Sequence, residues 1–446
     1  MSQLGLLTAR RFAPLFLTQF LGALNDNVFR FALIIFVTFT VAERTGLDTR
    51  MLVVLTGGIF ILPFFLFSAL AGQIADKYEK SRLIRHIKTA EVVVMGLGAV
   101  GFLIGNYPFL LAVLFLMGVQ STFFGPLKYG VLPQHLAGDE LTGGNGLIQM
   151  GTYVAILVGG MLGGLLASLG TVAPHAIVAT VVGVALIGRL CAGFIPHAAA
   201  SAPAIEIDTN LARSTWRILV ESARERGVLT LILLISLFWF VGATFLSVVP
   251  TYGKELLGAD ARAVTLLNAA FTVGIGIGSL ACERLSRRRV ELGLVPLAAL
   301  GISLAALDVW LAGAPAPVRL GLDNFFAHPP AVRMFVDLVL IGACGALYIV
   351  PLYAALQARA NAAWIARLLA ALNVTNALFM VASAGFTMAL YGAGVGVPGV
   401  FAAVAAINLA GMIAGAVALP EFFTRARAIL AGRRAPASAS PPDPPN

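Results

Sequence analysis

Long apolar runs alternate with short polar stretches along the whole chain, and this pattern predicts the architecture. Each run is mostly apolar and reaches the roughly 20 residues that an α-helix needs to cross a bilayer. A membrane β-barrel would instead show alternating strands of about ten residues. The twelve predicted spans are 12–41, 51–75, 89–106, 108–133, 143–170, 172–195, 228–250, 263–284, 290–312, 332–357, 366–391 and 396–423.

A polar stretch at 197–227 divides the runs into two sets of six. Such a division is typical of a duplicated transporter half. Aligned spans support the duplication, since Pro126 matches Pro351 and Asn145 matches Asn373, although apolar helices can also align by chance. We predict an all-α integral membrane fold of 12 transmembrane helices, with six-helix halves at 1–196 and 228–424, a linker at 197–227 and a disordered tail at 425–446.

Within the linker, apolar residues recur at helical spacing on one side and charged residues lie on the other. This pattern predicts an interfacial helix that lies on the cytoplasmic leaflet. The apolar stripe consists of Trp216, Leu219, Val220 and Ala223, and the polar side of Arg217, Glu221 and Glu225.

Charge sets the class and the orientation of the protein. Only 11% of the 446 residues are charged, against about 25% in soluble domains, which excludes a soluble enzyme. Twenty-two of the 30 Lys and Arg residues fall on one side of the predicted spans and six on the other. The positive-inside rule then places both termini in the cytoplasm, and the net charge of +9 reflects the inner leaflet rather than nucleic acid.

A few charges fall inside the predicted spans, where each costs roughly 2.5–3.5 kcal/mol on insertion scales. Asp26 and Arg30 lie four residues apart on one helix face, either as a self-neutralising pair or as a polar binding site. Lys128 lies between two prolines expected to bend the fourth span, and it either snorkels or binds an anion. The candidate substrate-binding residues are Asp26, Asn27, Arg30, Gln120, Lys128, Asn373 and Asn376.

Other charged residues are expected at the interfaces. Glu91 should meet the basic loop before it. Asp308 and Asp337 should lie near the outer ends of their spans, where Asp337 can pair with Arg333 one turn away. The strong intramembrane charges would then all lie in the first six spans. A cavity between the halves would have one ionic wall and one apolar wall, which suits an amphiphile; the apolar wall would include Phe238, Trp239, Phe240 and Tyr348.

Two motifs resemble those of enzymes, but their surroundings in the sequence do not support an enzymatic role. Gly96, Gly98 and Gly101 form a literal GxGxxG inside an apolar helix, where glycines allow close helix packing rather than dinucleotide binding. His135 precedes Glu140 by five residues, but no soluble catalytic domain houses them. We therefore predict no enzyme activity, no cofactor and no metal site.

The loop after the second span contains a glycine, an aspartate four residues later, and several cations. The simplest interpretation is a solvated basic loop without a specific function. Together with twelve spans in two halves, however, it resembles the gating motif of the major facilitator superfamily, in which the aspartate and basic residues lock the cytoplasmic side. The resemblance implies gating roles for Gly72, Asp76, Lys77, Arg82 and Arg85.

Within that superfamily, three stretches resemble the bacterial lysophospholipid transporters: FLTQFLGALNDNVFRFAL (16–33), GPLKYGVLPQHLAGDELTGGNGL (125–147) and VPLYAALQARANAAWIARLLAALNVTNALFM (350–380). The resemblance implies movement of lysophospholipid from the outer to the inner leaflet of the bacterial inner membrane. Lys128 or Arg30 would bind the phosphate and Asp26 an amine. Because no acyltransferase domain follows Arg434, a separate acyltransferase and acyl carrier protein would re-acylate the product.

The alternative function is proton-coupled export of amphiphilic drugs. The segment 159–164, Gly-Gly-Met-Leu-Gly-Gly, approaches the antiporter motif of such exporters, with Gly160 where proline is usual. Asp26 would then carry the proton. The fourth span lacks the arginine typical of that class. A third class, a membrane scaffold without transport activity, leaves Asp26, Arg30 and Lys128 unexplained.

Overall fold

The computed structural model describes residues 3–36, 49–224, 226–287, 289–313, 318–361 and 363–431. Its regular elements there are helices, apart from one isolated bridge between Ala259 and Leu320. The helices are α1 Ala13–Phe36, α3 Thr49–Lys77, α4 Lys80–Ile104, α5 Tyr107–Gly130, α6 Leu132–His135, α7 Leu141–Ala167, α8 Ala173–Gly193, α9 Leu211–Arg224, α10 Arg226–Thr251, α11 Ala261–Leu285, α12 Leu294–Ala312, α13 Pro329–Arg359, α14 Ile365–Gly392, α15 Val397–Ala418 and α16 Glu421–Leu430, with short 3-10 and π turns at Gln3–Thr8, Gly170–Val172, Tyr252–Leu256 and Phe325–Ala327.

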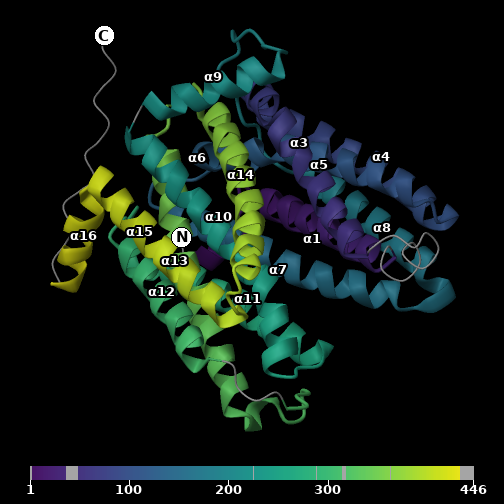
Figure 1. Cartoon of the computed structure of the whole chain (residues 1–446). Helices are drawn as coiled ribbons and strands as arrows, with labels where there is room; N and C mark the ends of the chain where they lie inside the picture. Colours follow the sequence, from purple (N-terminus) through teal and green to yellow (C-terminus); the bar gives the residue numbers. More distant parts are fainter. Residues whose placement is uncertain are drawn as a thin grey trace. The chain divides into compact units, whose positions relative to one another are not determined.

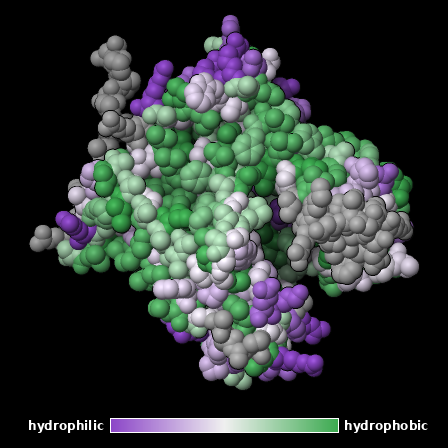
Figure 2. Space-filling model, in the orientation of Figure 1, coloured by the Kyte–Doolittle hydropathy of each residue, from purple (hydrophilic) through white to green (hydrophobic). Residues whose placement is uncertain are grey.

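Eleven helices in the described ranges are long and apolar enough to cross a membrane. A helix satisfies its backbone hydrogen bonds internally, which hydrocarbon requires. Apolar residues accordingly cover much of the face shown in Figure 2. Although 24 residues long, α1 is not among the eleven, because two asparagines, Asp26 and Arg30 interrupt its apolar run. The protein is thus an all-helical, multi-pass membrane protein.

Local sequence signals mark several helix ends. Glu79 caps α4 by accepting hydrogen bonds from the backbone of Ser81 and Arg82, and α4 ends at Gly105, whose φ of 64° suits glycine. One expectation was wrong: Pro133 does not bend the fourth span, because α5 ends at Gly130 and Pro133 lies in the first turn of α6. Proline needs no backbone donor in that position.

The contacts group the chain into two units. The first comprises 1–137, 147–222 and 362–377, and the second 138–146, 223–361 and 378–446. Both units therefore take part of α7 and part of α14. The six-helix halves at 1–196 and 228–424 stay a prediction, and the tail from 432 lies outside the described residues.

In the first unit, α4 packs against α5 and α8, α1 packs against α8, and α3 packs against α5. Glycines allow the closest approaches. A Cβ added at Gly159 would lie 2.7 Å from the Leu24 carbonyl oxygen, and one at Gly163 would lie 2.6 Å from that of Val28. Helix α7 therefore touches the backbone of α1 directly beside Asp26, through a glycine pair one turn apart.

In the second unit, α13 packs against α10, α11 and α12, and α15 packs against α10 and α12. The crossing of α11 and α13 is the tightest, because a Cβ at Gly278 would lie 2.1 Å from the Ala343 carbonyl oxygen and one at Gly274 2.2 Å from that of Val339. Close backbone contact of this kind is typical of membrane helices, where lipid supplies no hydrophobic drive for association.

The predicted linker helix is present as α9, and the side that it buries is not the apolar stripe. Ser214, Ile218 and Ser222 are its buried residues. Trp216 and Val220 are 71% and 38% exposed. Trp216 and Val220 of the apolar stripe are thus exposed, whereas Leu219 packs against the core of Ala69, Ile218, Ala370 and Ala371. Glu225 of the predicted polar side lies outside the described residues.

Candidate functional site

A buried ionic network joins α1, α4 and α5 inside the first unit. Lys88 Nζ lies 2.5 Å from Glu91 Oε2, with side chains only 1% and 2% exposed. Gln120 Nε2 donates to the same oxygen at 2.9 Å, and Asn25 Nδ2 donates to Oε1 at 3.4 Å. Lys88 Nζ also lies over the Phe124 ring. Both carboxylate oxygens of Glu91 are therefore satisfied, as a buried charge requires.

Asp26 lies beside this network with spare hydrogen-bonding capacity. Ser121 Oγ donates to Asp26 Oδ2 at 2.7 Å, whereas the buried Oδ1 has no hydrogen-bond partner in the part of the chain that the structure describes. Asp26 interacts electrostatically with Glu91, Lys88 and Arg30. It therefore holds a carboxylate oxygen that a ligand could use.

The expected Asp26–Arg30 pair does not form within the 4.0 Å that defines an ion pair. The Arg30 guanidinium instead lies 5.3 Å from the centre of the Phe60 ring, and the Asp26 carboxylate turns to Ser121. A helix-surface pair is worth only about 0.2–0.5 kcal/mol, so contacts from α3 and α5 override it. Among the described residues, the Arg30 guanidinium has no hydrogen-bond partner.

Lys128 faces the same region of the unit. Its Nζ lies 4.9 Å from the centre of the Tyr129 ring, and its charge interacts with those of Asp26 and Lys88. Within the described part of the chain its ammonium group makes no hydrogen bond. Asp26, Arg30, Lys88, Glu91 and Lys128, which we call the charge cluster, sum to +1 in their ordinary charge states.

Three of the sequence-predicted site residues stand apart from the charge cluster. Asn27 donates to the Ala23 carbonyl of its own helix at 2.8 Å and packs against Gly159. Asn373 Nδ2 is buried, has no hydrogen-bond partner in the described ranges, and lies against Gly125, one turn before Lys128 on α5. Asn376 is 8% exposed on α14. Only Asn373 of these offers an unused donor near a cluster residue.

Sequence reasoning missed four contributors: Asn25, Lys88, Glu91 and Ser121. Lys88 follows a run of cations in the preceding loop, but it is fully buried beside Glu91. The signal was present, since a Lys and a Glu three residues apart lead directly into the apolar run of α4. Glu91 does meet a cation of the preceding segment, as expected, but inside the unit rather than at its surface.

The predicted gating residues divide into two groups. Asp76 is fully buried, and its carboxylate accepts hydrogen bonds from Ala366 N at 3.1 Å, Arg367 N at 3.2 Å and Arg367 Nε at 3.0 Å. These donors open α14, so Asp76 caps that helix and complements its dipole. Gly72 allows α14 to approach α3 closely, because a Cβ at this position would lie 2.7 Å from Ala370 Cβ and 2.9 Å from Arg367 Cα. Arg367 is thus a partner that sequence reasoning missed.

The three predicted gating cations lie elsewhere. Arg82 is exposed, and Arg85 lies 3.9 Å from Glu79 rather than on α14. Lys77 makes no hydrogen bond or ion pair with any described residue. Burial opposes ionisation of Glu79, but hydrogen bonds from Ser81, Ala198 and Arg82 outweigh it and lower the pKa of that carboxyl.

Two expectations for the second unit were wrong. Arg333 forms a bidentate pair with Asp308, at 2.7 Å to each carboxylate oxygen, and not with Asp337. Asp337 is only 5% exposed, and its Oδ2 has no hydrogen-bond partner among the residues that the structure describes. Buried charge is therefore not confined to the first half. Arg333 pairs with Asp308 because α12 supplies a better-placed carboxylate than its own helix does.

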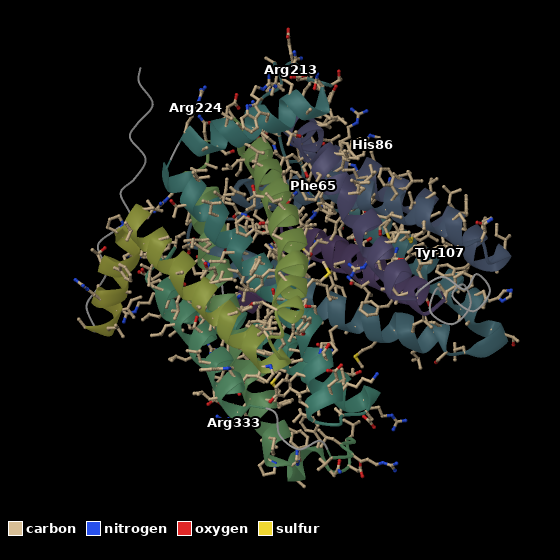
Figure 3. The ribbon with its side chains drawn as sticks, in the orientation of Figure 1. Phe65, His86, Tyr107, Arg213, Arg224 and Arg333 are labelled. Atoms are coloured by element: carbon tan, nitrogen blue, oxygen red, sulfur yellow. The ribbon has the colours of Figure 1, made fainter. Side chains whose placement is uncertain are left out.

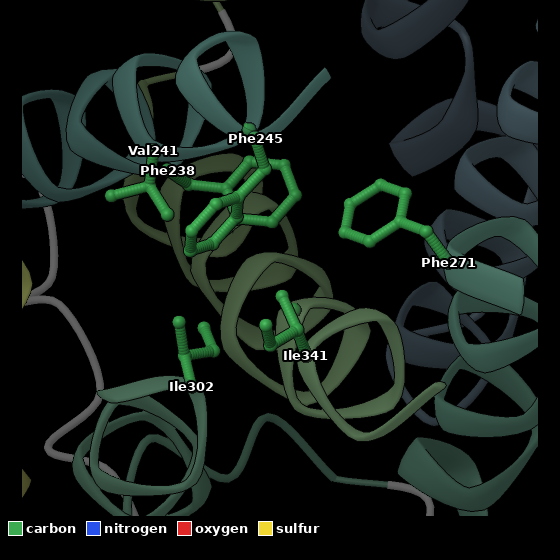
Figure 4. A pocket seen from close by; sticks show the side chains of 8 residues that line it. Phe238, Val241, Phe245, Phe271, Ile302 and Ile341 are labelled. Carbon is green, nitrogen blue, oxygen red and sulfur yellow. The ribbon is translucent and has the colours of Figure 1, made fainter. Parts of the chain in front are cut away.

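Several residues of the predicted apolar cavity wall pack within the protein core. Phe238 stacks on Tyr348 at 6.2 Å, the Tyr348 hydroxyl donates to the Leu234 carbonyl, and Phe240 packs against Phe386. The nearby cavity, lined by Phe238, Val241 and other apolar residues, has a volume of about 10 Å³ (Figure 4). Such a space is too small and too apolar to hold a polar ligand.

The enzyme-like motifs have structural explanations. His135 directs its ring nitrogens at the carbonyls of Arg11 and His197, at 3.1 and 3.2 Å. Gly98 lies against Phe29, and Gly101 against Leu110. In the described ranges no group of three or more His, Cys, Asp or Glu residues could hold a metal ion.

Comparison with known proteins fits this picture of a helical membrane protein with charged groups inside. The family model of the Major Facilitator Superfamily matches residues 15–378. The chain belongs to this superfamily of transporters.

Its relatives narrow the placement to the lysophospholipid transporter family. The lysophospholipid transporter LplT of Serratia proteamaculans is 29% identical over 358 residues, covering 79% of this chain and 81% of the relative. That of Klebsiella pneumoniae subsp. pneumoniae is 30% identical, covering 76% and 78%.

Solved structures support the fold. The human organic anion transporter MFSD10 (TETRAN) superposes with a TM-score of 0.70 at 16% identity, covering 90% of this chain and 99% of the other. The E. coli fucose:proton symporter FucP gives a TM-score of 0.63 at 16% identity, covering 91% and 97%.

Proposed function

We propose that this protein moves lysophospholipids from the outer to the inner leaflet of a bacterial inner membrane by alternating access, with both termini in the cytoplasm. The observation that carries the proposal is the charge cluster, in which Asp26 Oδ1 and the head groups of Arg30 and Lys128 lack hydrogen-bond partners among the described residues. Relatives named lysophospholipid transporters supply the substrate class.

The roles follow from charge. Lys88 and Glu91 neutralise each other, which leaves two cations and one carboxylate for the substrate. Arg30 and Lys128 bind the phosphate, by charge-assisted hydrogen bonds, and Asp26 binds the ammonium of an ethanolamine-like head group. Asp76 and Gly72 hold α14 against α3, and release of this contact is part of the transport cycle.

The exporter alternative has no specific support in the geometry. Its glycine motif is accounted for by packing, since Gly159 and Gly163 meet the backbone of α1. After transport, a separate acyltransferase that uses acyl carrier protein would consume the lysophospholipid.

The test is uptake of labelled lysophosphatidylethanolamine by spheroplasts. Asp26→Ala and Lys128→Ala should abolish uptake, because each removes a group that binds the head group. Lys254→Ala is the matched control, since Lys254 is an exposed cation outside the charge cluster. Full uptake in both cluster variants would refute the site, and drug resistance without lysolipid uptake would favour the exporter.

A further inference from the structure

Helix α9 has three distinct faces. Ser214, Ile218 and Ser222 face the protein. Arg213 and Arg217 lie on a polar face, where they meet Asp208 at 2.9 and 3.8 Å. A third, apolar face carries Trp216 and Val220, which are both exposed. An amphipathic helix of this kind in a membrane protein is expected to contact lipid.

An open groove of about 350 Å³ runs between this apolar face and α3. Phe65 and Leu66 of α3 form one side, and Ala212, Trp216 and Leu219 of α9 form the other. The buried core of Ala69, Ile218 and Ala370 lies beside it. Its volume falls within the range of ligand sites, and its walls are almost entirely apolar.

At the end of the polar face beside the groove, Arg213 and Arg217 exceed Asp208 by one positive charge. Glu221 lies one turn beyond Arg217, and Arg224 follows it by three residues at the far end of the helix. Hydrogen bonding by Arg213 lowers the pKa of Asp208, so this carboxylate stays ionised and cancels one arginine. Arg217 keeps only the longer contact to Asp208 and is 46% exposed. Arg213 is three residues from Trp216 and therefore its neighbour on the helix surface. Figure 3 shows Arg213 and Arg224 at opposite ends of α9, and Phe65 on α3.

We propose that this groove binds an acyl chain of an anionic phospholipid of the surrounding membrane, and that Arg217, with Arg213, binds its phosphate. The occupant follows from the surface: an apolar slot continuous with an exposed apolar face, next to a net positive charge and an exposed tryptophan, complements an anionic amphiphile. Tryptophan commonly lies at the head-group level of a bilayer. The site is independent of the transported substrate.

The test uses Trp216 as the reporter, in a protein with Trp239, Trp310 and Trp364 replaced by Phe. This protein is placed in nanodiscs that contain a small fraction of phosphatidylglycerol or phosphatidylcholine with the same brominated chains. Half-maximal quenching of Trp216 should need about fivefold less phosphatidylglycerol, the effect of one cation near the membrane surface.

Two matched pairs of variants locate the site. Arg217→Gln should abolish the preference, and Arg224→Gln, at the far end of α9, should keep it. Ala212→Phe fills the groove and should abolish the preference, whereas Ala223→Phe, also exposed on α9 but outside the groove, should keep it. Equal quenching by both lipids, or equal loss in the two arginine variants, would overturn the proposal.

Native mass spectrometry of the full chain with all tryptophans provides a second measurement. Wild type should retain a phosphatidylglycerol adduct that Ala212→Phe loses. The absence of that adduct from the wild type would overturn the proposal regardless of how the single-tryptophan protein folds.

Discussion

The contact between Asp76 and the start of α14 can be broken by two independent changes. Asp76→Asn removes the charge that pairs with Arg367 and complements the helix dipole. Hydrogen bonds to a charged group are worth about 1.5–3 kcal/mol, and a charge at a helix terminus contributes up to about 2 kcal/mol. Taking about 2 kcal/mol for the lost charge, the equilibrium between closed and released α14 shifts about 30-fold.

Gly72→Ala should open the same contact by a steric route. The new Cβ would lie within 3.0 Å of the Ala366 oxygen and of Arg367 Cα, both backbone atoms, so α3 and α14 must separate. Gly58→Ala is the matched control on the same helix, because a Cβ at Gly58 meets nothing within 4 Å.

Amide hydrogen exchange at the start of α14 measures the result directly. The amides of Ala366 and Arg367 donate to Asp76, and no carbonyl of α14 itself can bond to them. Their exchange therefore reports the released state. We expect it to rise about 30-fold in Asp76→Asn and to rise in Gly72→Ala, with no change in Gly58→Ala. Unchanged exchange in Asp76→Asn, or equal rates in the two glycine variants, would refute the reasoning.

Two further predictions concern stability. Glu91→Ala leaves Lys88 charged and unpaired in the core, and should lower the free energy of unfolding in SDS titration by about 3–5 kcal/mol. Adding Lys88→Met should recover part of that loss. Arg85→Ala breaks a surface pair and should cost below about 1 kcal/mol. Because the Glu79 pKa is lowered, its stabilisation is complete above its ordinary pKa of 4.5 and is lost as the pH falls through the lowered value. The melting temperature of Glu79→Gln should therefore lie below that of the wild type at pH 7 and converge with it in acid; a constant difference would contradict the assignment.

The sequence predicted the helices well because long apolar runs admit few alternatives in a membrane. It placed α9 correctly from its periodicity, but left open which side of the helix meets the protein. Ser214 and Ser222 are small enough to let the helix pack closely, whereas Trp216 is not. Apolar character alone does not tell a side that meets protein from a side that meets lipid, so the sequence held no signal for this choice.

The site was predicted in part, for a related reason. Charges deep in an apolar run, such as Asp26 and Arg30, are conspicuous, but their partners are set by neighbouring helices. Ser121 and Phe60 lie on α5 and α3, and their proximity to α1 is a tertiary fact. Lys88 was not among the predicted site residues because it follows a run of loop cations. A count of charges does not show how deeply each side chain is buried.

The two sets of charges in the first unit differ in a way that separates structure from function. Glu91 has both oxygens satisfied by Lys88, Gln120 and Asn25, so the protein itself accounts for this charge. Asp26 Oδ1, Arg30 and Lys128 lack such partners within the described ranges, and the cost of this in free energy rises as water is excluded. Groups of this kind are expected where a ligand completes the hydrogen bonding. We therefore propose that Arg30 and Lys128 bind the substrate phosphate and Asp26 its amine, while the Lys88–Glu91 pair holds α1, α4 and α5 in place around them.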